Sequence, residues 1–204
     1  IRTYSPTEYV HSIITGQIST GDKVFDGLTD GTLMYNGVSL KTFTQKDFLS
    51  SASQNSRIYV TNETDGIWNY NGGATMYRAG SPVPSSACTA AAPDAGGFSG
   101  DYTIVVTYTN ANGYDGNPST EATVSTATKK INLTNIPINT NADYNVAGRK
   151  IWIFGGTTPL YSTYVLLKTI SDNTTVAVSG LDTTDVDTLT VLEDDNGLPP
   201  LLHQ

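Results

Sequence analysis

The sequence predicts an all-β protein, with a two-sheet sandwich of about seven strands in its second half and a smaller region of β-hairpins before it. Two observations carry this prediction. Runs rich in Val, Ile, Thr and Tyr recur at near-regular spacing between clusters of Gly, Asn, Asp and Pro, which is typical of short strands joined by turns. Apolar residues also show no helical periodicity in the second half of the chain.

The clearest predicted strand is residues 99–108, where β-branched and aromatic side chains fit a pleated, half-buried surface. A turn is expected at 110–119, because Asn and Gly accept positive φ and Pro cannot donate to a ladder. The later strands are predicted at 119–126, 130–137, 149–156, 164–170 and 175–178. Alternation places Ile151 and Ile153 on one face and Trp152 and Phe154 on the other, so both faces are expected to be at least partly covered.

An internal repeat lies in the first part of the chain. Asp30-Gly31-Thr32-Leu33-Met34-Tyr35-Asn36-Gly37 aligns without gaps on Asp65-Gly66-Ile67-Trp68-Asn69-Tyr70-Asn71-Gly72, 35 residues later. Asp-Gly and Asn-Gly predict tight turns on either side of an apolar, aromatic strand. The period suggests successive β-propeller blades or a meander, although two copies cannot close a propeller. The alternative is a chance recurrence of ordinary hairpin turns.

Residues 81–97 are dense in Pro, Ser, Ala and Gly and hold no periodic apolar residues, which predicts a linker. The expected organisation is a propeller-blade-like hairpin region at 1–80, this linker, and a sandwich with a C-terminal tail at 98–204. Near the N-terminus, a helical turn starting at Glu8 and capped by Thr7 competes with a strand, because the β-branched residues that follow suit both.

Composition excludes several classes of function. A net charge of −8 repels phosphate backbones, so no direct nucleic-acid binding is expected. No apolar run has the length to cross a bilayer, so no membrane insertion is expected. The sequence begins at Ile1 without a signal segment, and we expect a processed chain or a part of a longer one.

No catalytic, cofactor-binding or metal-ligating residues are predicted, so the chain is expected not to be an enzyme and to use no cofactor. Nucleotide, phosphate-loop and nucleophile-elbow motifs do not occur. His11 and His203 are too far apart in sequence to indicate a metal site, and Cys88 is expected to be a free thiol in the linker. Turn formation explains the carboxylates better than calcium binding or glycoside hydrolysis does. These carboxylates are Asp22, Asp26, Asp30, Asp65, Asp182, Asp185, Asp187, Glu193, Asp194 and Asp195.

Tyrosines are the candidate interaction residues, because Tyr offers apolar area with little entropy to lose. Exposed together, five of them would form a surface for sugar stacking or subunit contact: Tyr102, Tyr108, Tyr114, Tyr161 and Tyr164. The alternative is that they face the sandwich core, and we favour it for Tyr102 and Tyr108.

A family resemblance rests on five segments in this order: Gly-Asp-Tyr-Thr-Ile-Val-Val-Thr-Tyr, Asn-Gly-Tyr-Asp-Gly-Asn-Pro-Ser, Ile-Asn-Leu-Thr-Asn-Ile-Pro, Gly-Arg-Lys-Ile-Trp-Ile-Phe and Tyr-Val-Leu-Leu-Lys-Thr-Ile-Ser-Asp-Asn-Thr-Thr. Together with 181–189 and 197–200, they resemble the fibronectin type III-like modules of bacteriophage virion proteins. Where the usual pattern has Arg-Ile-Tyr-Arg, this chain has Arg-Lys-Ile-Trp-Ile-Phe at 149–154.

The resemblance implies a structural role in the virion, as a tail hub or nozzle protein of a short-tailed phage or as a head-tail component. The implied partners are other virion proteins. Separately, two repeats are too few to bury a propeller core and leave sheet edges unpaired, so we expect the hairpins to pack against further blades of a longer parent chain or against copies of the same chain in a homo-oligomeric ring. Two alternatives stay open. One is a carbohydrate-binding or host-adhesion module whose partner is a surface glycan, and the other is a capsid decoration protein.

Overall fold

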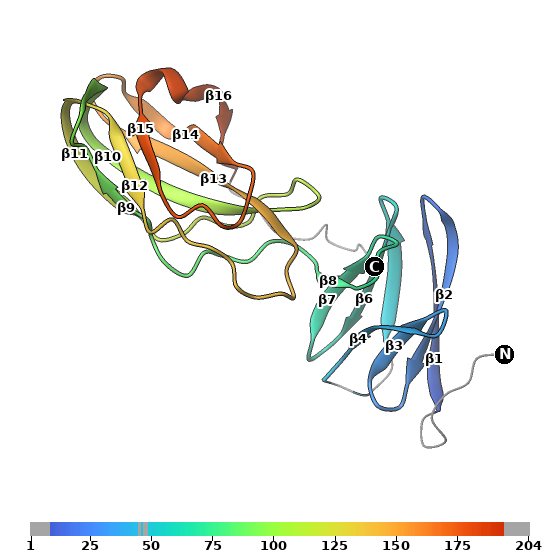
Figure 1. The fold of residues 1–204 in the computed structure, drawn as a ribbon. Helices are drawn as coiled ribbons and strands as arrows, with labels where there is room; N and C mark the ends of the chain where they lie inside the picture. The colour runs from blue at the N-terminus through green and yellow to red at the C-terminus, as the bar shows by residue number, and fades with distance from the viewer. Residues whose placement is uncertain (1–8, 45, 47–48, 194–204) are drawn as a thin grey trace. The chain divides into compact units, whose positions relative to one another are not determined.

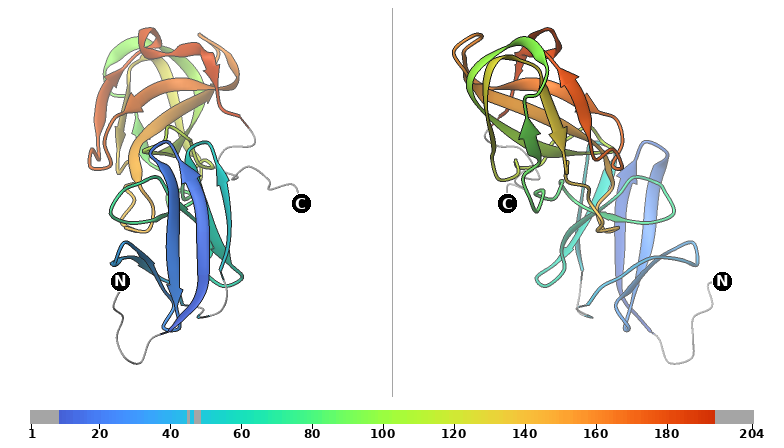
Figure 2. Two further views of the ribbon diagram at one scale, coloured as in Figure 1. Left: turned by 90° about the vertical axis from the view of Figure 1, so that its right-hand side faces the viewer. Right: turned by 60° about the vertical axis from the view of Figure 1, so that its left-hand side comes forward.

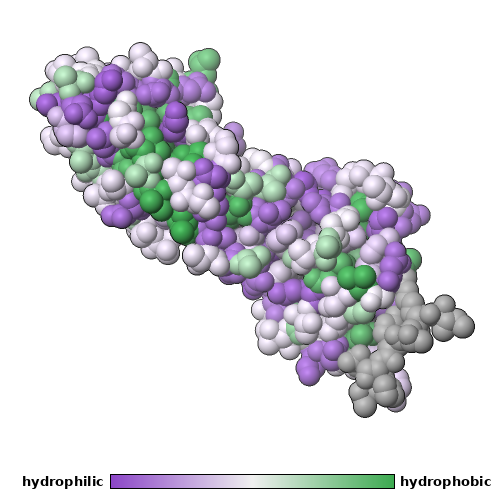
Figure 3. Space-filling view, in the orientation of Figure 1, coloured by the Kyte–Doolittle hydropathy of each residue, from purple (hydrophilic) through white to green (hydrophobic). Residues whose placement is uncertain are grey.

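The structure is a computed structural model that describes residues 9–44, 46 and 49–193, and its regular elements there are antiparallel β-strands apart from one 3-10 turn (Figure 1). The predicted all-β, sandwich-type fold is confirmed. The chain divides into two compact units, Ile1–Ala79 and Gly80–Gln204. Figure 3 shows hydrophobic residues set among polar ones at the surface of both units.

The first unit is built from two four-stranded antiparallel sheets, in the orders β1-β2-β3-β4 and β5-β6-β7-β8. Each sheet is a meander in which consecutive strands pair (Figure 2). The bounds are β1 (Val10–Ile18), β2 (Gly21–Leu28), β3 (Thr32–Tyr35), β4 (Val38–Thr42), β5 (Ser50–Gln54), β6 (Arg57–Asn62), β7 (Gly66–Tyr70) and β8 (Tyr77–Arg78). Strand β1 bears out the strand alternative near the N-terminus, whereas Thr7 and Glu8 lie outside the described residues.

The turns of the repeat form where the sequence predicts them. Asn36 and Gly37 have φ values of 50° and 80°, which is the pair of left-handed residues that a type I′ hairpin requires. The Asp30 carboxylate accepts a hydrogen bond from the N–H of Thr32 at 2.8 Å, and that of Asp65 accepts one from the N–H of Thr44 at 3.1 Å. Both aspartates therefore serve turns and connections, as expected.

The two copies of the repeat pack their equivalent faces against each other. Leu33 and its equivalent Trp68 lie in one buried cluster, and the rings of Tyr35 and its equivalent Tyr70 are 5.8 Å apart. In a propeller, each blade is rotated about the central channel relative to the one before it. The front face of one blade therefore packs on the back face of the next, and equivalent residues do not meet. Here equivalent residues of the two copies point into the same core. The predicted meander is present, but its packing is that of a sandwich and not of neighbouring blades.

The second unit is a sandwich of a five-stranded sheet, in the order β11-β10-β13-β14-β16, and a three-stranded sheet, in the order β15-β12-β9. Its core contains Ile104, Ile151 and Ile153 from the larger sheet and Ile131 and Leu133 from the smaller one. The bounds are β9 (Thr89–Ala91), β10 (Ala95–Asn110), β11 (Ala122–Lys129), β12 (Ile131–Thr134), β13 (Val146–Gly155), β14 (Tyr161–Ile170), β15 (Val178–Leu181) and β16 (Asp187–Val191), with a 3-10 turn η1 (Thr183–Asp185).

Six strands of this unit follow the connectivity of an immunoglobulin-type sandwich. In that fold strands B and E pair in one sheet, and G, F, C and C′ are neighbours in the other. Here β9 pairs with β12, while β14, β13, β10 and β11 are successive neighbours. Strand β15 joins the free side of β12, and β16 extends the larger sheet beyond β14.

The second half of the predicted linker is part of this sandwich. Thr89–Ala91 forms β9 and pairs with β12, and β10 already begins at Ala95. Cys88 is buried in the core rather than placed in a free connector, and burial raises the pKa of its thiol to about 11. The segment was misjudged because Ala and Pro carry little strand propensity, whereas the pairing that fixes β9 is supplied by a strand about 40 residues later.

Candidate interaction surface

The structure separates the five candidate tyrosines. Tyr102, Tyr108 and Tyr161 are buried, Tyr164 is half-buried, and Tyr114 is 54% exposed in the loop after β10. The core alternative favoured for Tyr102 and Tyr108 is therefore confirmed, because even-numbered residues of β10 point inward here. Burial and the nearby Tyr102 raise the pKa of Tyr161 to about 12. The five residues do not form one surface.

A different aromatic group lies on the outer face of the larger sheet. Phe154 on β13 and Tyr164 on β14 have ring centroids 5.4 Å apart and planes tilted by 39°. Phe154 is 39% exposed. The hydroxyl of Tyr164 donates to Oε1 of Glu121, the residue before β11, at 2.9 Å. We call Trp152, Phe154, Tyr164 and Glu121 the aromatic face.

Trp152 gives this face a fixed base, since it shares the outward orientation of Phe154 yet is only 2% exposed. Its indole N–H donates to Oγ1 of Thr107 on β10 at 3.0 Å. Lys150 lies 5.7 Å from the Trp152 ring, and its ammonium pairs with Oδ2 of Asp115 at 2.6 Å. Hydrogen bonds and the ion pair thus hold the surroundings of Trp152 in one arrangement.

The electrostatics of Tyr164 favour the neutral phenol. Burial raises its pKa, and the hydrogen bond to Glu121 and the charge of that carboxylate raise it further. The hydroxyl therefore stays protonated at neutral pH and donates to Glu121, which is exposed to solvent. The aromatic face presents ring surface and one negative charge side by side.

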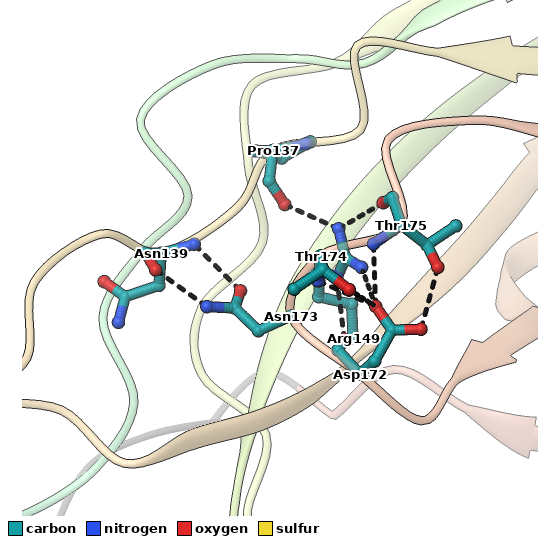
Figure 4. Close-up of polar contacts among 7 residues, drawn as sticks. All are labelled: Pro137, Asn139, Arg149, Asp172, Asn173, Thr174 and Thr175. Atoms are coloured by element: carbon teal, nitrogen blue, oxygen red, sulfur yellow. Dashed lines mark hydrogen bonds and ion pairs between the residues drawn. The ribbon is translucent and has the colours of Figure 1, made fainter.

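A second polar group braces the loops at one end of the sandwich (Figure 4). Arg149 on β13 is fully buried and donates to the carbonyls of Pro137, at 3.1 Å, and Thr175, at 2.7 Å. It also donates to the carbonyl of Asp172, at 3.2 Å, and to Oδ1 of that residue, at 3.0 Å. Burial lowers the pKa of Arg149, and the charge of Asp172 opposes that shift. One guanidinium thus ties the β12–β13 loop to the β14–β15 loop.

Asp172 organises the loop that follows it. Its carboxylate accepts hydrogen bonds from the backbone N–H groups of Thr175 and Thr174, both at 2.7 Å, and these bonds lower its pKa. Asn139 and Asn173 add a reciprocal pair, in which each accepts a hydrogen bond from the other (Figure 4). This loop replaces the start of the strand predicted at 175–178, so β15 begins only at Val178.

The carboxylates of the β15–β16 connection also serve turns. Asp182 and Asp185 form a capping box around η1, and Asp182 also accepts the N–H of Gly97 at 2.8 Å. Asp187 accepts the hydroxyl of Thr190 and the N–H of Leu189. The turn interpretation is confirmed for these three residues, whereas Asp194, Asp195 and His203 lie outside the described part of the chain. Within that part, no group of three or more His, Cys, Asp and Glu residues is arranged to hold a metal ion.

Sequence reasoning missed the roles of Arg149, Asp172 and Glu121. The sequence does contain a signal for Arg149. Strand alternation places it on the same face as the core residues Ile151 and Ile153, and a buried guanidinium needs hydrogen-bond partners inside the protein. Asp172 begins an Asp-Asn-Thr-Thr segment that suits side-chain capture of backbone N–H groups. Nothing in the sequence pairs Glu121 with Tyr164, since 43 residues separate them.

Comparisons of the chain with protein-family models, with curated protein sequences and with solved structures find no match. Among the described residues there is no helix with the length and apolar character that crossing a membrane requires.

Proposed function

We propose that the chain is a non-enzymatic structural protein of a bacteriophage virion that acts through protein–protein contacts, as a tail hub or nozzle protein or a head-tail component. The family resemblance supplies the virion setting. One observation supports a contact role: the charged side chains of Arg149, Asp172 and Asp182 form hydrogen bonds to backbone groups of loops and turns, which is a structural use of charge. Loops held by hydrogen bonds and an aromatic face on the outer side of a sheet suit recognition of a partner.

The test is quantitative mass spectrometry of purified particles of the phage that encodes the chain. A fixed stoichiometry relative to the major capsid protein, retained through density-gradient purification, is the expected result. Absence of the chain from intact particles would contradict the proposal. A copy number that matches the capsid lattice instead of the tail would assign the chain to capsid decoration.

Copies of the chain are among the proposed partners, in a homo-oligomeric ring. The first unit needs no further sheet to bury its core, because Phe25 and Leu33 are already covered by the second sheet. Its outer face supports the proposal instead, where Ile13 on β1 and Val24 on β2 are 68% and 42% exposed. Sedimentation equilibrium should detect an oligomer at micromolar concentration that Ile13→Ser dissociates. A wild-type chain that stays monomeric would contradict self-association.

A carbohydrate-binding or adhesion role is the second candidate, and the pairing of Phe154 and Tyr164 beside Glu121 favours it. Aromatic rings stack on the apolar face of a pyranose, and a carboxylate accepts its hydroxyl groups. Binding of the full chain to a defined glycan on an array, lost in Phe154→Leu, is the result this candidate predicts.

A further inference from the structure

The aromatic face combines two features that a cationic side chain recognises. Phe154 and Tyr164 present ring surface on an open sheet, and Glu121 holds a carboxylate at their edge. Tyr164 gives Glu121 a hydrogen bond but no positive charge, so this contact does not neutralise the attraction of the carboxylate for a cation. A cation over an aromatic ring is attracted by the negative face of the ring as well.

The charge of the whole unit acts in the same direction. Residues 80–204 hold five Lys and Arg residues against twelve Asp and Glu residues, a net charge of −7. On the outer face of β13, the ammonium of Lys150 is already paired with Asp115 at 2.6 Å. A basic partner is therefore attracted to this unit over distance, whereas an acidic one is repelled.

The geometry is also prepared before a partner arrives. The Tyr164 hydroxyl is fixed by Glu121, and Trp152, next to Phe154 on the same strand face, is fixed by Thr107. Little side-chain entropy is then lost on binding. Among cationic side chains, arginine fits best, because its planar guanidinium stacks on a ring while it donates two hydrogen bonds to a carboxylate.

We propose that the aromatic face docks a basic segment of a partner protein, with an arginine side chain stacked on Phe154 and Tyr164 and paired with Glu121. This inference rests on the proposed function, because it names the kind of protein surface that the contact role requires. Arginine is enriched in the cores of protein interfaces, and so are aromatic residues.

The test is an NMR titration of the full chain with an acetylated tri-arginine amide and, in parallel, with the same peptide containing citrulline, a neutral isostere of arginine. We expect saturable shifts at Glu121, Phe154 and Tyr164 with the arginine peptide and none with citrulline. Glu121→Gln keeps an acceptor for Tyr164 but removes the charge, and should weaken binding by about twofold to fivefold. Phe154→Leu should do the same, while Phe154→Tyr should retain binding.

Glu63→Gln is the matched control, because it removes one exposed negative charge from the other unit and should leave the affinity unchanged. Equal shifts with the citrulline peptide, or shifts confined to other residues, would overturn the proposal. Shifts at these three residues with methyl glucoside but not with arginine would also overturn it, in favour of a glycan. If the chain is stoichiometric in particles but the arginine peptide does not bind, this inference fails and the proposed function stands.

Discussion

The two units of this protein reach the same two-layer architecture by different routes. In the first, a repeated segment brings equivalent residues together, so that Tyr35 meets Tyr70 and Leu33 shares a core with Trp68. In the second, the two sheets are built from unlike strands whose connections cross between the sheets. Similar layers thus arise from a repeat in one unit and from long-range pairing in the other.

The connections show what this difference requires. Consecutive strands of a meander are joined mainly by short turns, and the first unit forms one of them with Asn36 and Gly37. Crossing connections are longer, and their backbone polar groups need partners of their own. The second unit provides these partners with Arg149, Asp172 and Asn173, which bind the loops to one another. Side-chain hydrogen bonds therefore join two separate loops in the second unit, whereas in the first unit they serve a short turn at Asp30 and the β4–β5 connection at Thr44.

The largest expected effect comes from Trp68→Ala in the first unit. Trp68 is buried, packs edge-on against Phe43 at 6.1 Å and has the ammonium of Lys41 over its ring. Removal of a buried Trp side chain typically costs about 3–5 kcal/mol of unfolding free energy. The two buried cores share no residue, so hydrogen exchange should show loss of protection at 10–78 while β10 and β13 stay protected. Equal loss in both units would show that they are one cooperative structure.

Arg149→Met is the corresponding change in the second unit. It preserves apolar volume but leaves the carbonyls of Pro137 and Thr175 without their donor, which we expect to cost about 2–3 kcal/mol. The control is Lys168→Met, an exposed cation on the neighbouring strand β14, which should change stability by less than about 0.5 kcal/mol. Urea unfolding of the second unit measures both. Similar small effects would mean that the loops hold without the guanidinium.

Local features were predictable because their causes are local. The Asn36-Gly37 turn follows from the φ preferences of two residues, and the opposed faces of Ile151 and Trp152 follow from strand alternation. The partners of strands and side chains were not predictable, because they depend on residues far along the chain. Strand β9 is fixed by β12, and Glu121 acquires its role only when folding brings Tyr164 beside it. The repeat itself is visible in the sequence. Which faces of its two copies meet depends on how two whole sheets pack, and the sequence does not show that.

Acid should lower the unfolding free energy of the second unit by less than either substitution does, because its capping carboxylates are exposed to solvent. Hydrogen bonds lower the pKa of Asp172, Asp182 and Asp187 in the folded state. A lowered folded pKa contributes stability above the unfolded value, about 3.9, and that contribution is lost as the pH falls below it. The unfolding free energy should therefore decrease between about pH 5 and pH 2.5. Asp172→Asn should be less stable at pH 7 but flatter over this range, and an unchanged slope would contradict the assignment.

The face-to-face packing of the repeat is tested most directly by nuclear Overhauser effects between the rings of Tyr35 and Tyr70 in the full chain. Their centroids are 5.8 Å apart across the core of the first unit, so ring-to-ring contacts should be observed. Phe25 should show contacts to Tyr70 as well, with centroids at 5.3 Å. If the copies packed as successive blades, Tyr35 and Tyr70 would lie on equivalent faces of their sheets, and only one of the two would face the core between them. In that case no cross-peak between them would appear, and the face-to-face packing of the repeat would be wrong.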